Sequence, residues 1–381
     1  MGLTSRLFEA AAARPHVLLL STPGGTAVRL EAERVLAGRG WPRVTTPAAA
    51  DVLLQCGRVD TRLADAVDRV WNQLPGPRAR TAPHAVDQVE PALDEAQGRL
   101  RDLPYQRADA SERRGVPADR DLTMVDAADD RDGLMLEQLH PHLGPVLPDW
   151  PAGLVLRVAL QGDVVQFVDA DVWGLPLSGD PFWCAPALRA GRGAEVTAVF
   201  AARRTAAAHL DSVARLLGVA GWTGAATEAA RLRADVLAEP DPAACAVRVG
   251  CFARRVGRSR RLWWALRGVG VLPGSEAIEA GVSGPALRAS HGPRADAHDR
   301  CRQWLTESVQ ALTGRPPERA EGPRGRIDAG VESTLASRSL LDVATRLMVG
   351  QELIVARLVL ASFDPDPEEL LADRVPVSAD G

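Results

Sequence analysis

Cysteine is the residue of this chain best suited to redox or cluster chemistry, and its spacing sets the first limits. The five cysteines are Cys56, Cys184, Cys245, Cys251 and Cys301, and no two of them form a Cys-x-x-Cys pair. Iron–sulfur clusters and structural zinc sites need several thiolates brought together. The sequence therefore predicts neither kind of centre and no disulfide framework.

The histidines allow a weaker metal-site hypothesis. His140 and His142 would face one side of a strand and could then share a metal ion. Pro141 stands between them and no other ligand is close in sequence, so exposed loop histidines are the preferred interpretation. His209 lies beside the apolar stripe of a predicted helix, where hydrogen-bonded or exposed histidines are commoner than ligands.

A glycine-rich turn could cradle a phosphate. Pro23-Gly24-Gly25 follows the apolar run Val17–Leu20 and precedes a predicted helix, roughly Val28–Gly38. Backbone N–H groups at a helix start bind anions. The P-loop lysine and a full Gly-x-Gly-x-x-Gly are both missing, so a plain strand–helix turn is favoured over a nucleotide site.

One predicted helix, Val247–Leu266, is rich in arginine. It could present an anion-facing or partner-facing surface, or simply a solvated face. All 45 basic residues of the chain are arginine, and this compositional bias favours the solvated face. Cys251 and Trp263 are predicted on the buried side. The arginines concerned are Arg248, Arg254, Arg255, Arg258, Arg260 and Arg261.

Composition narrows the class of protein. The chain has 381 residues, 46% apolar and 25% charged, with a formal net charge of −4. These values predict a globular protein with room for two domains, and they argue against a nucleic-acid binder or a polybasic membrane anchor. No signal peptide is recognised, and the most apolar stretch, Leu353–Phe363, is too short for a bilayer span. The predicted location is cytoplasmic.

The elements that must position these residues fall into two units. In residues 15–110, short apolar strands alternate with helices, including Asp51–Cys56 and Arg62–Gln73, which predicts a parallel, flavodoxin-like sheet. Residues 106–133 are polar and are predicted to be a linker or surface loop. Leu154–Leu160 and Val164–Val168 form a predicted β-hairpin. Helices are predicted at 201–221, 225–238, 296–312 and 335–362.

Part of the first unit resembles the small iron–sulfur subunit of respiratory complex I. The similar segments are Ala50–Leu54 with Cys56-Gly57, and the helix end Val70–Arg78. That family binds a [4Fe–4S] cluster through an adjacent cysteine pair and two later cysteines. Here Ser21 and Thr22 stand at the pair, and no cysteine follows Arg78. The resemblance thus implies a small-subunit fold that has lost its cluster ligands.

The second unit resembles the quinone-site large subunit of complex I, to which group 4 membrane-bound [NiFe] hydrogenases are also related. Its best match is Val269–Ser290, with Glu321–Gly325 and Val359–Asp364 following in the family order. Leu139–Pro151 is similar to the loop that lines the quinone headgroup in that family. The hydrogenase Cys-x-x-Cys pairs are absent, so nickel–iron chemistry is not expected.

The headgroup loop departs from the family at its chemical residues. Leu147 stands at the family's first histidine, and the second is lost within 150–152. The remnant loop is Leu147, Pro148, Asp149 and Trp150. The single tyrosine, Tyr105, lies well before this unit, so the family's tyrosine partner to quinone is not evident.

Together the resemblances imply a fusion of the two quinone-site subunits, with residues 1–105 small-subunit-like, 106–133 a linker and 134–381 large-subunit-like. The leading hypothesis is a redox-silent hydrophilic subunit that couples to membrane-embedded proton-channel subunits on the inner face of the cell membrane, without a span or nucleic acid of its own. No metal and no catalytic residue is predicted, and quinone remains a possible ligand. A second hypothesis is an active quinone oxidoreductase using Asp149 or His142. A third is a soluble α/β enzyme that binds a nucleotide at Pro23-Gly24-Gly25.

Overall fold

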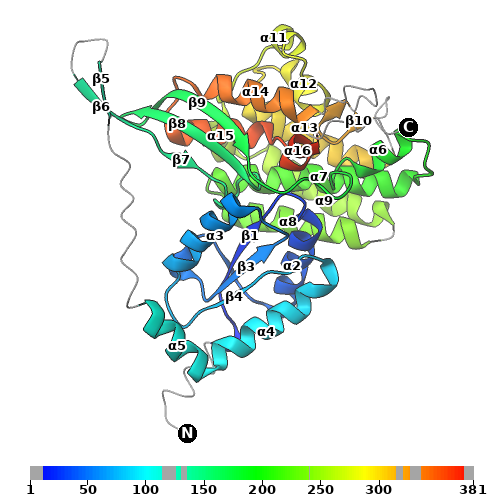
Figure 1. Ribbon diagram of the computed structural model, residues 1–381. Coiled ribbons are helices and arrows are strands. Elements are labelled where there is room, and N and C mark those ends of the chain that lie inside the picture. The colour runs from blue at the N-terminus through cyan, green and yellow to red at the C-terminus, as the bar shows by residue number, and fades with distance from the viewer. Residues whose placement is uncertain are drawn as a thin grey trace, which may run out of the picture.

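Two units lie against each other along one broad interface. The computed structural model describes residues 12–113, 126–129, 135–239, 241–314, 321–326 and 336–372. In Figure 1 the α/β unit forms the lower body, and a long β-hairpin with many helices forms the upper body. The hairpin and its neighbouring strands extend away from the helices toward the upper left.

The N-terminal unit is built on a four-stranded parallel sheet, which confirms the predicted α/β architecture. Its order 2-1-3-4 is that of flavodoxin-like sheets. Every residue from Val52 to Cys56 is buried, because helices cover both faces of the sheet. In spatial order the strands are β2 (Arg43–Val44), β1 (Val17–Ser21), β3 (Val52–Cys56) and β4 (Ala79–Thr81).

Helices sandwich this sheet. α2 (Thr26–Arg39) and α4 (Val89–Arg101) pack on one face, and α3 (Thr61–Gln73) packs on the other. α3 begins where the Asp60 carboxylate accepts a hydrogen bond from the Leu63 N–H at 2.8 Å, which satisfies one of the free donors of the first turn. Two 3₁₀ turns, η1 (Pro47–Ala49) and η2 (Val86–Gln88), connect the elements.

The segment predicted as a linker begins inside a helix. α5 (Leu103–Arg113) packs on the N-terminal unit through polar contacts. Gln106 is buried and exchanges two hydrogen bonds of 2.9 Å with the backbone of Arg78, whose guanidinium pairs with Asp109 at 2.9 Å. Because the buried face of α5 is polar, hydrophobic periodicity could not reveal it. Further along, β5 (Asp126–Asp129) pairs with β6 (Met135–Leu139), and the rest of the predicted linker beyond Arg113 lies outside the described residues.

The predicted hairpin is present and longer than expected. β8 (Leu154–Gln161) and β9 (Val164–Val172) run antiparallel, joined at Gly162, whose φ of 63° suits the tight turn. β6 and the short β7 (His142–Leu143) pair with the other edge of β8.

Two helices predicted as continuous are each divided in two. The segment 247–266 forms α9 (Pro242–Gly257) and α10 (Arg260–Leu266), because Ser259 caps the second helix by accepting from the Leu262 N–H at 3.2 Å. The pattern 335–362 forms α14 (Ala336–Met348) and α15 (Leu353–Phe363), and the break between them docks on β9.

That docking explains the second break. The Val165 N–H donates to the Gln351 carbonyl at 2.8 Å, and the Gly350 N–H donates to the Val165 carbonyl at 2.7 Å. Gly350 adopts a φ of 81°, which a helical residue does not. The remaining elements of this unit follow in one list: α6 (Ala185–Gly191), α7 (Ala198–Val219), α8 (Thr223–Ala238), α11 (Gly274–Glu279), α12 (Gly284–Ser290), α13 (Ala297–Leu312), β10 (Glu321–Gly322), β11 (Gly325–Arg326) and α16 (Pro367–Ala372).

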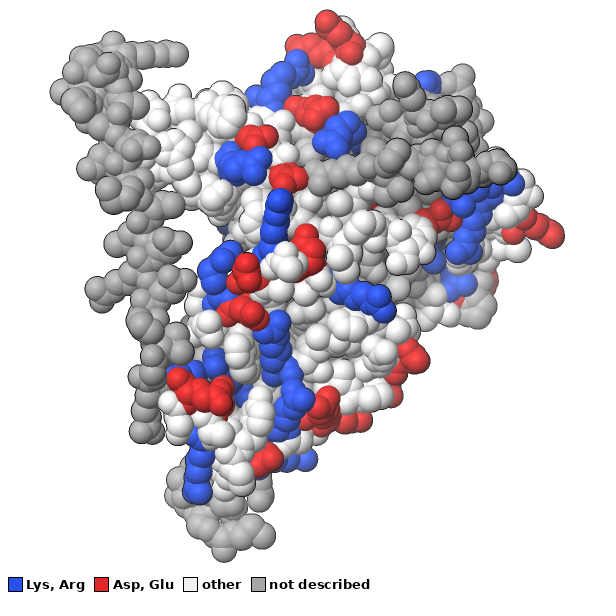
Figure 2. All heavy atoms as spheres, in the orientation of Figure 1, with Lys and Arg blue, Asp and Glu red and all other residues white. Residues whose placement is uncertain are grey.

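Each unit contributes to the core of the other. Leu30 of α2 belongs to the large hydrophobic core of the second unit, while Val146 packs against the core on the α3 side of the sheet. Figure 2 shows arginine and acidic side chains interspersed over the visible face, without a large field of one sign. Within the described residues, no helix combines the length and apolarity needed to cross a bilayer.

Candidate functional site

A cavity of about 1000 Å³ lies between the two units. Its floor is formed by the carboxyl end of β1, by α2 and by residues 41–49 of the N-terminal unit. Its opposite wall is formed by residues 145–152, α7 and α8, with Arg324 and residues 366–368 closing one side. Ligand sites of α/β sheets form outside the carboxyl ends of the strands, so this is the expected place for one.

The remnant loop lines this cavity. Leu147, Pro148, Asp149 and Trp150 all contribute to its wall. Trp150 is buried, and its indole Nε1–H donates to the Leu154 carbonyl at 2.7 Å, which fixes the loop to the start of β8. The structure therefore brings the four predicted residues together at one surface.

Asp149 is the ionisable group of that loop. It adopts a φ of 52° and accepts no hydrogen bond from any described residue. Its position between the cavity walls raises the pKa of its carboxyl through desolvation, while Arg43, Arg215 and Arg357 act in the opposite direction. Asp149 can thus hold a proton at a higher pH than an ordinary aspartate and can offer it to a molecule in the cavity.

The positions predicted as lost cluster ligands lie at the cavity floor but are engaged in the backbone of the turn. Ser21 lines the cavity, and its neighbour Thr22 is buried. The Thr22 hydroxyl donates to the Cys56 carbonyl at 3.0 Å. Cys56 pairs with Ser21 across the sheet, and burial raises the pKa of its thiol to about 12. This sulfur is a buried thiol, not a thiolate ligand.

The predicted anion cradle at Pro23-Gly24-Gly25 is occupied by a carboxylate of the same chain. Glu368 Oε1 accepts from the Gly24 N–H at 3.1 Å, the Thr26 N–H at 3.4 Å and the Thr26 hydroxyl at 2.6 Å. Its Oε2 accepts from the Phe182 N–H at 2.7 Å. The donors at the start of α2 thus contact a carboxylate of the same chain, and this contact joins α16 to the N-terminal unit.

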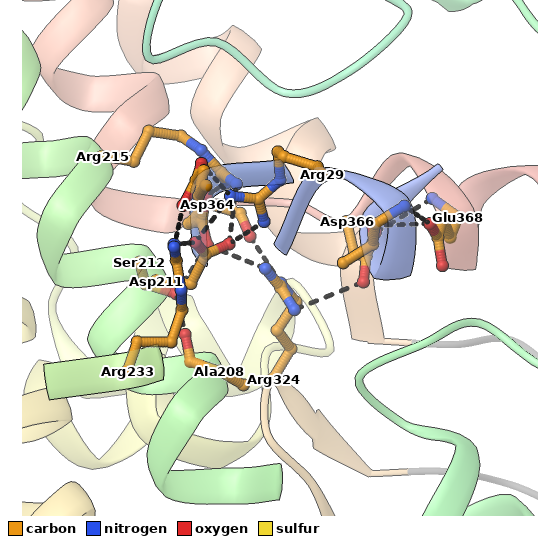
Figure 3. Close-up of polar contacts among 12 residues, drawn as sticks. Arg29, Ala208, Asp211, Ser212, Arg215, Arg233, Arg324, Asp364, Asp366 and Glu368 are labelled. Atoms are coloured by element: carbon orange, nitrogen blue, oxygen red, sulfur yellow. Dashed lines mark hydrogen bonds and ion pairs between the residues drawn. The ribbon is translucent and has the colours of Figure 1, made fainter. Parts of the chain in front are cut away.

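Beside the cradle, a buried ion network joins the units (Figure 3). Asp211 of α7 accepts two hydrogen bonds from Arg29 of α2, at 3.1 and 2.8 Å, and also pairs with Arg215 and Arg233. Arg233 of α8 reaches across to Glu33 of α2 as well. Burial alone would raise the pKa of Asp211, but the surrounding guanidiniums hold it below its usual value.

The network continues into the second unit through two segments that carry the large-subunit resemblance. Arg324, from the Glu321–Gly325 segment, donates to Asp364 Oδ2 at 2.8 Å and to the Asp364 carbonyl at 2.7 Å. Asp364, from the Val359–Asp364 segment, also accepts from the Ser212 hydroxyl at 2.6 Å. Both groups are buried, and Figure 3 shows them facing the cluster around Asp211.

The third such segment packs on the same place. Gly284, with a φ of 65°, lies so close to the chain at Arg324-Gly325 that a Cβ there would stand 2.5 Å from the Gly325 Cα. The Ser283 hydroxyl accepts from the Arg326 N–H at 2.8 Å. The three segments thus form one packed support behind the ion network.

One group of possible metal ligands lies elsewhere in the described part of the chain. Ligand atoms of Asp296, His298 and Asp299 lie within 4.8 Å of one another, and burial lowers the pKa of His298. Asp296 already caps α13 by accepting from the Asp299 N–H at 3.1 Å, and Asp299 accepts from the Arg294 N–H at 2.9 Å in the turn before the helix. The helix N-terminus repels a cation, so the arrangement fits a cap better than a metal centre.

Three further expectations are settled by position. His140 and His142 are exposed, as predicted, and they do not line the cavity; His142 lies in the short strand β7 and not in the predicted loop. His209 is buried, with its Nε2 3.4 Å from a carboxylate oxygen of Glu307. Cys251 was predicted to be buried and is exposed, because Val249, Phe252 and Val256 form the buried face of α9.

Comparison with known proteins adds no assignment: no family model matches the chain, and no curated protein matches it.

Proposed function

We propose that the chain is a redox-silent hydrophilic subunit of a complex I-like membrane assembly, in which it serves as a structural and coupling module. One observation carries the proposal: Ser21 and the 147–150 loop, identified from two separate resemblances, line the same cavity. In the family that the chain resembles, the corresponding positions belong to the small and large quinone-site subunits. Their convergence supports a shared origin of the cavity.

The electron-carrying groups of that family have no counterpart in these positions. Ser21 and Thr22 replace a thiolate pair, and Cys56 has a buried thiol with a pKa of about 12. Electron transfer through a cluster would need thiolates here. A coupling role needs only that the two units move as one body, and the network around Asp211 supplies rigid contacts between them.

Purification from native membranes tests the proposal. Affinity capture of the full chain should bring down membrane-embedded subunits, with iron, acid-labile sulfide and nickel well below one equivalent per chain. Stoichiometric iron and sulfide in this chain would refute the redox-silent role. Recovery of a partner-free protein from intact membranes would refute the membrane assembly.

Asp149 favours a second candidate, an active quinone oxidoreductase with a divergent site. Its raised pKa and lack of hydrogen-bond partners among the described residues suit a proton donor to a reduced quinone. If this function is present, the solubilised complex should reduce a quinone analogue, and Asp149→Ala should abolish the reduction. Asp235→Ala is the matched control, because Asp235 also lines the cavity but pairs with Arg248. Equal activity in both variants would remove this candidate.

A further inference from the structure

A basic and aromatic surface lies on α10 and the turn after it. Residues 242–275 include seven arginines and neither aspartate nor glutamate. Two of the seven, Arg248 and Arg255, pair with Asp235 and Glu228 of α8.

The other arginines of this surface are not neutralised. Those on and beside α10 are exposed and form no ion pair with any described residue. Together with Arg294 from the α12–α13 connection, they place a local excess of positive charge on a chain whose formal net charge is −4. We call this set the basic surface: Arg258, Arg260, Arg261, Arg267 and Arg294, with Trp263 and Trp264.

Aromatic side chains sit among these charges. Trp264 is 58% exposed, and the Arg267 guanidinium lies 3.7 Å from the centre of its ring. Arg294 lies 5.2 Å from the ring of Trp263. Val271, just beyond, is 42% exposed. Exposed apolar groups that lie together beside unpaired charges suit a partner that offers both negative charge and an apolar medium.

The fold displays this surface rigidly. Leu262 and Leu266 bury the opposite side of α10 in the core of the second unit, and Ser259 caps its first turn. The tryptophans are therefore held outward by packing beneath them, and the surface does not need to fold upon binding.

We propose that the basic surface binds directly to an anionic lipid bilayer. Phospholipid headgroups supply negative charge for the arginines, and the boundary with the acyl chains accepts tryptophan and valine side chains. A nucleic acid could stack a base on Trp264 and an acidic protein could pair with the arginines, but the headgroup–acyl boundary also offers an apolar medium to the exposed Val271. The inference stands on this surface alone, so its failure would leave the proposed function untouched.

Vesicle binding by the full chain tests the charge requirement. Vesicles of phosphatidylcholine with phosphatidylglycerol should bind the protein, whereas vesicles of phosphatidylcholine alone should not. Each arginine near an anionic bilayer contributes about a fivefold factor in partitioning, so Arg260→Gln with Arg261→Gln should weaken binding about 25-fold. The control pair, Arg248→Gln with Arg255→Gln, removes the same charge from positions already neutralised and should change binding less than about threefold. Equal losses in the two pairs, or no binding to anionic vesicles, would overturn the proposal.

Lipid-borne quenching tests the insertion of Trp264. Brominated acyl chains should quench the fluorescence of the bound protein, and Trp264→Phe should remove most of that quenching while vesicle binding persists. If Trp264→Phe leaves the quenching unchanged, the tryptophan does not enter the bilayer, and an acidic macromolecule becomes the better ligand. Because Trp264 is mostly exposed, the phenylalanine variant should keep the circular dichroism spectrum of the original chain.

Discussion

Two acidic side chains that face the cavity differ in the number of hydrogen bonds that they accept. Glu368 accepts four hydrogen bonds, three of them at the start of α2 and one from the Phe182 N–H. Asp149, on the facing loop, accepts none from any described residue. The Glu368 carboxylate therefore holds the two units together, whereas the Asp149 carboxylate is available to bind a ligand.

The contrast separates structural from functional charge at the same site. A carboxylate with several donors is an internal tie, and its loss leaves buried donors unsatisfied. Asp149 has no such donors among the described residues and its side chain is exposed, so its loss leaves no buried donor unsatisfied. Substitutions at each kind of position should therefore differ in sign as well as in size.

The largest loss of unfolding free energy is expected at Asp211, which pairs with three arginines in the ion network between the two units. Asp211→Ala leaves Arg29 and Arg233 without their shared partner in a buried setting. Breaking a buried ion pair from one side costs about 3–5 kcal/mol of unfolding free energy. Urea denaturation of the variant gives this value directly.

A neighbouring exposed pair provides the control for Asp211. Asp235→Ala removes the Asp235–Arg248 pair, in which both side chains are about half exposed. Exposed pairs contribute about 0–1 kcal/mol, so the variant should remain close to the original stability. Equal losses at the two positions would mean that the network around Asp211 is not a structural tie.

Glu368→Ala should come next in size. The substitution leaves the Gly24 and Thr26 N–H groups and the Thr26 hydroxyl without their acceptor, at an estimated cost of about 2–3 kcal/mol. Because α16 would no longer be held to the start of α2, limited proteolysis should cleave residues 367–372 faster in the variant than in the original chain. Glu368→Gln keeps an acceptor oxygen and should recover about half of the loss. A gain in nucleotide binding by the alanine variant would show that the cradle serves an external anion.

The parts of this region that the sequence predicts are the local ones. The buried strand at Val52–Cys56 and the helix after Asp60 follow from apolar runs, spacing and a capping residue. The strand–helix turn at Pro23-Gly24-Gly25 is present, as the favoured interpretation predicts, and its donors contact a carboxylate of the same chain. Its occupant could not be predicted, because Glu368 is 344 residues from Gly24 in the chain.

Tertiary contacts account for the features that the sequence did not predict. Arg324 and Asp364 both lie in segments similar to the large subunit, yet nothing in their spacing indicates that they pair across 40 residues. The break at Gly350 depends on docking against β9, which the apolar periodicity of the segment does not record. The features that the sequence does not predict are thus polar contacts between residues far apart in the chain.

The unfolding free energy should depend on pH through Glu369, which lies next to Glu368 in α16. Burial, reinforced by Asp366, raises the pKa of Glu369 to about 7, although Arg324 and Ser337 oppose the shift. Because the folded-state pKa lies above the ordinary value of 4.5, the stability from this group is complete below pH 4.5 and is lost as pH rises toward about 7.

Glu369→Gln isolates this effect. The variant cannot ionise at this position, so its unfolding free energy relative to the original chain should rise by roughly 2–3 kcal/mol between pH 4.5 and 7.5. Urea titrations of both proteins across that interval measure the difference, in which all other titrating groups cancel. A constant difference would mean that Glu369 is ionised throughout.

Asp149→Asn should produce the smallest change in stability, and it therefore gives the clearest contrast with Glu368. No described donor loses a partner, and Asp149 is exposed, so the unfolding free energy should stay within about 0.5 kcal/mol of that of the original chain or rise slightly. Any rise should be larger at pH 8 than at pH 4, because only the ionised form carries the desolvation that raises the pKa of this carboxyl. A loss of unfolding free energy comparable to that of Glu368→Ala would mean that Asp149, like Glu368, holds the structure together. Asp149 would then not be available to a ligand in the cavity.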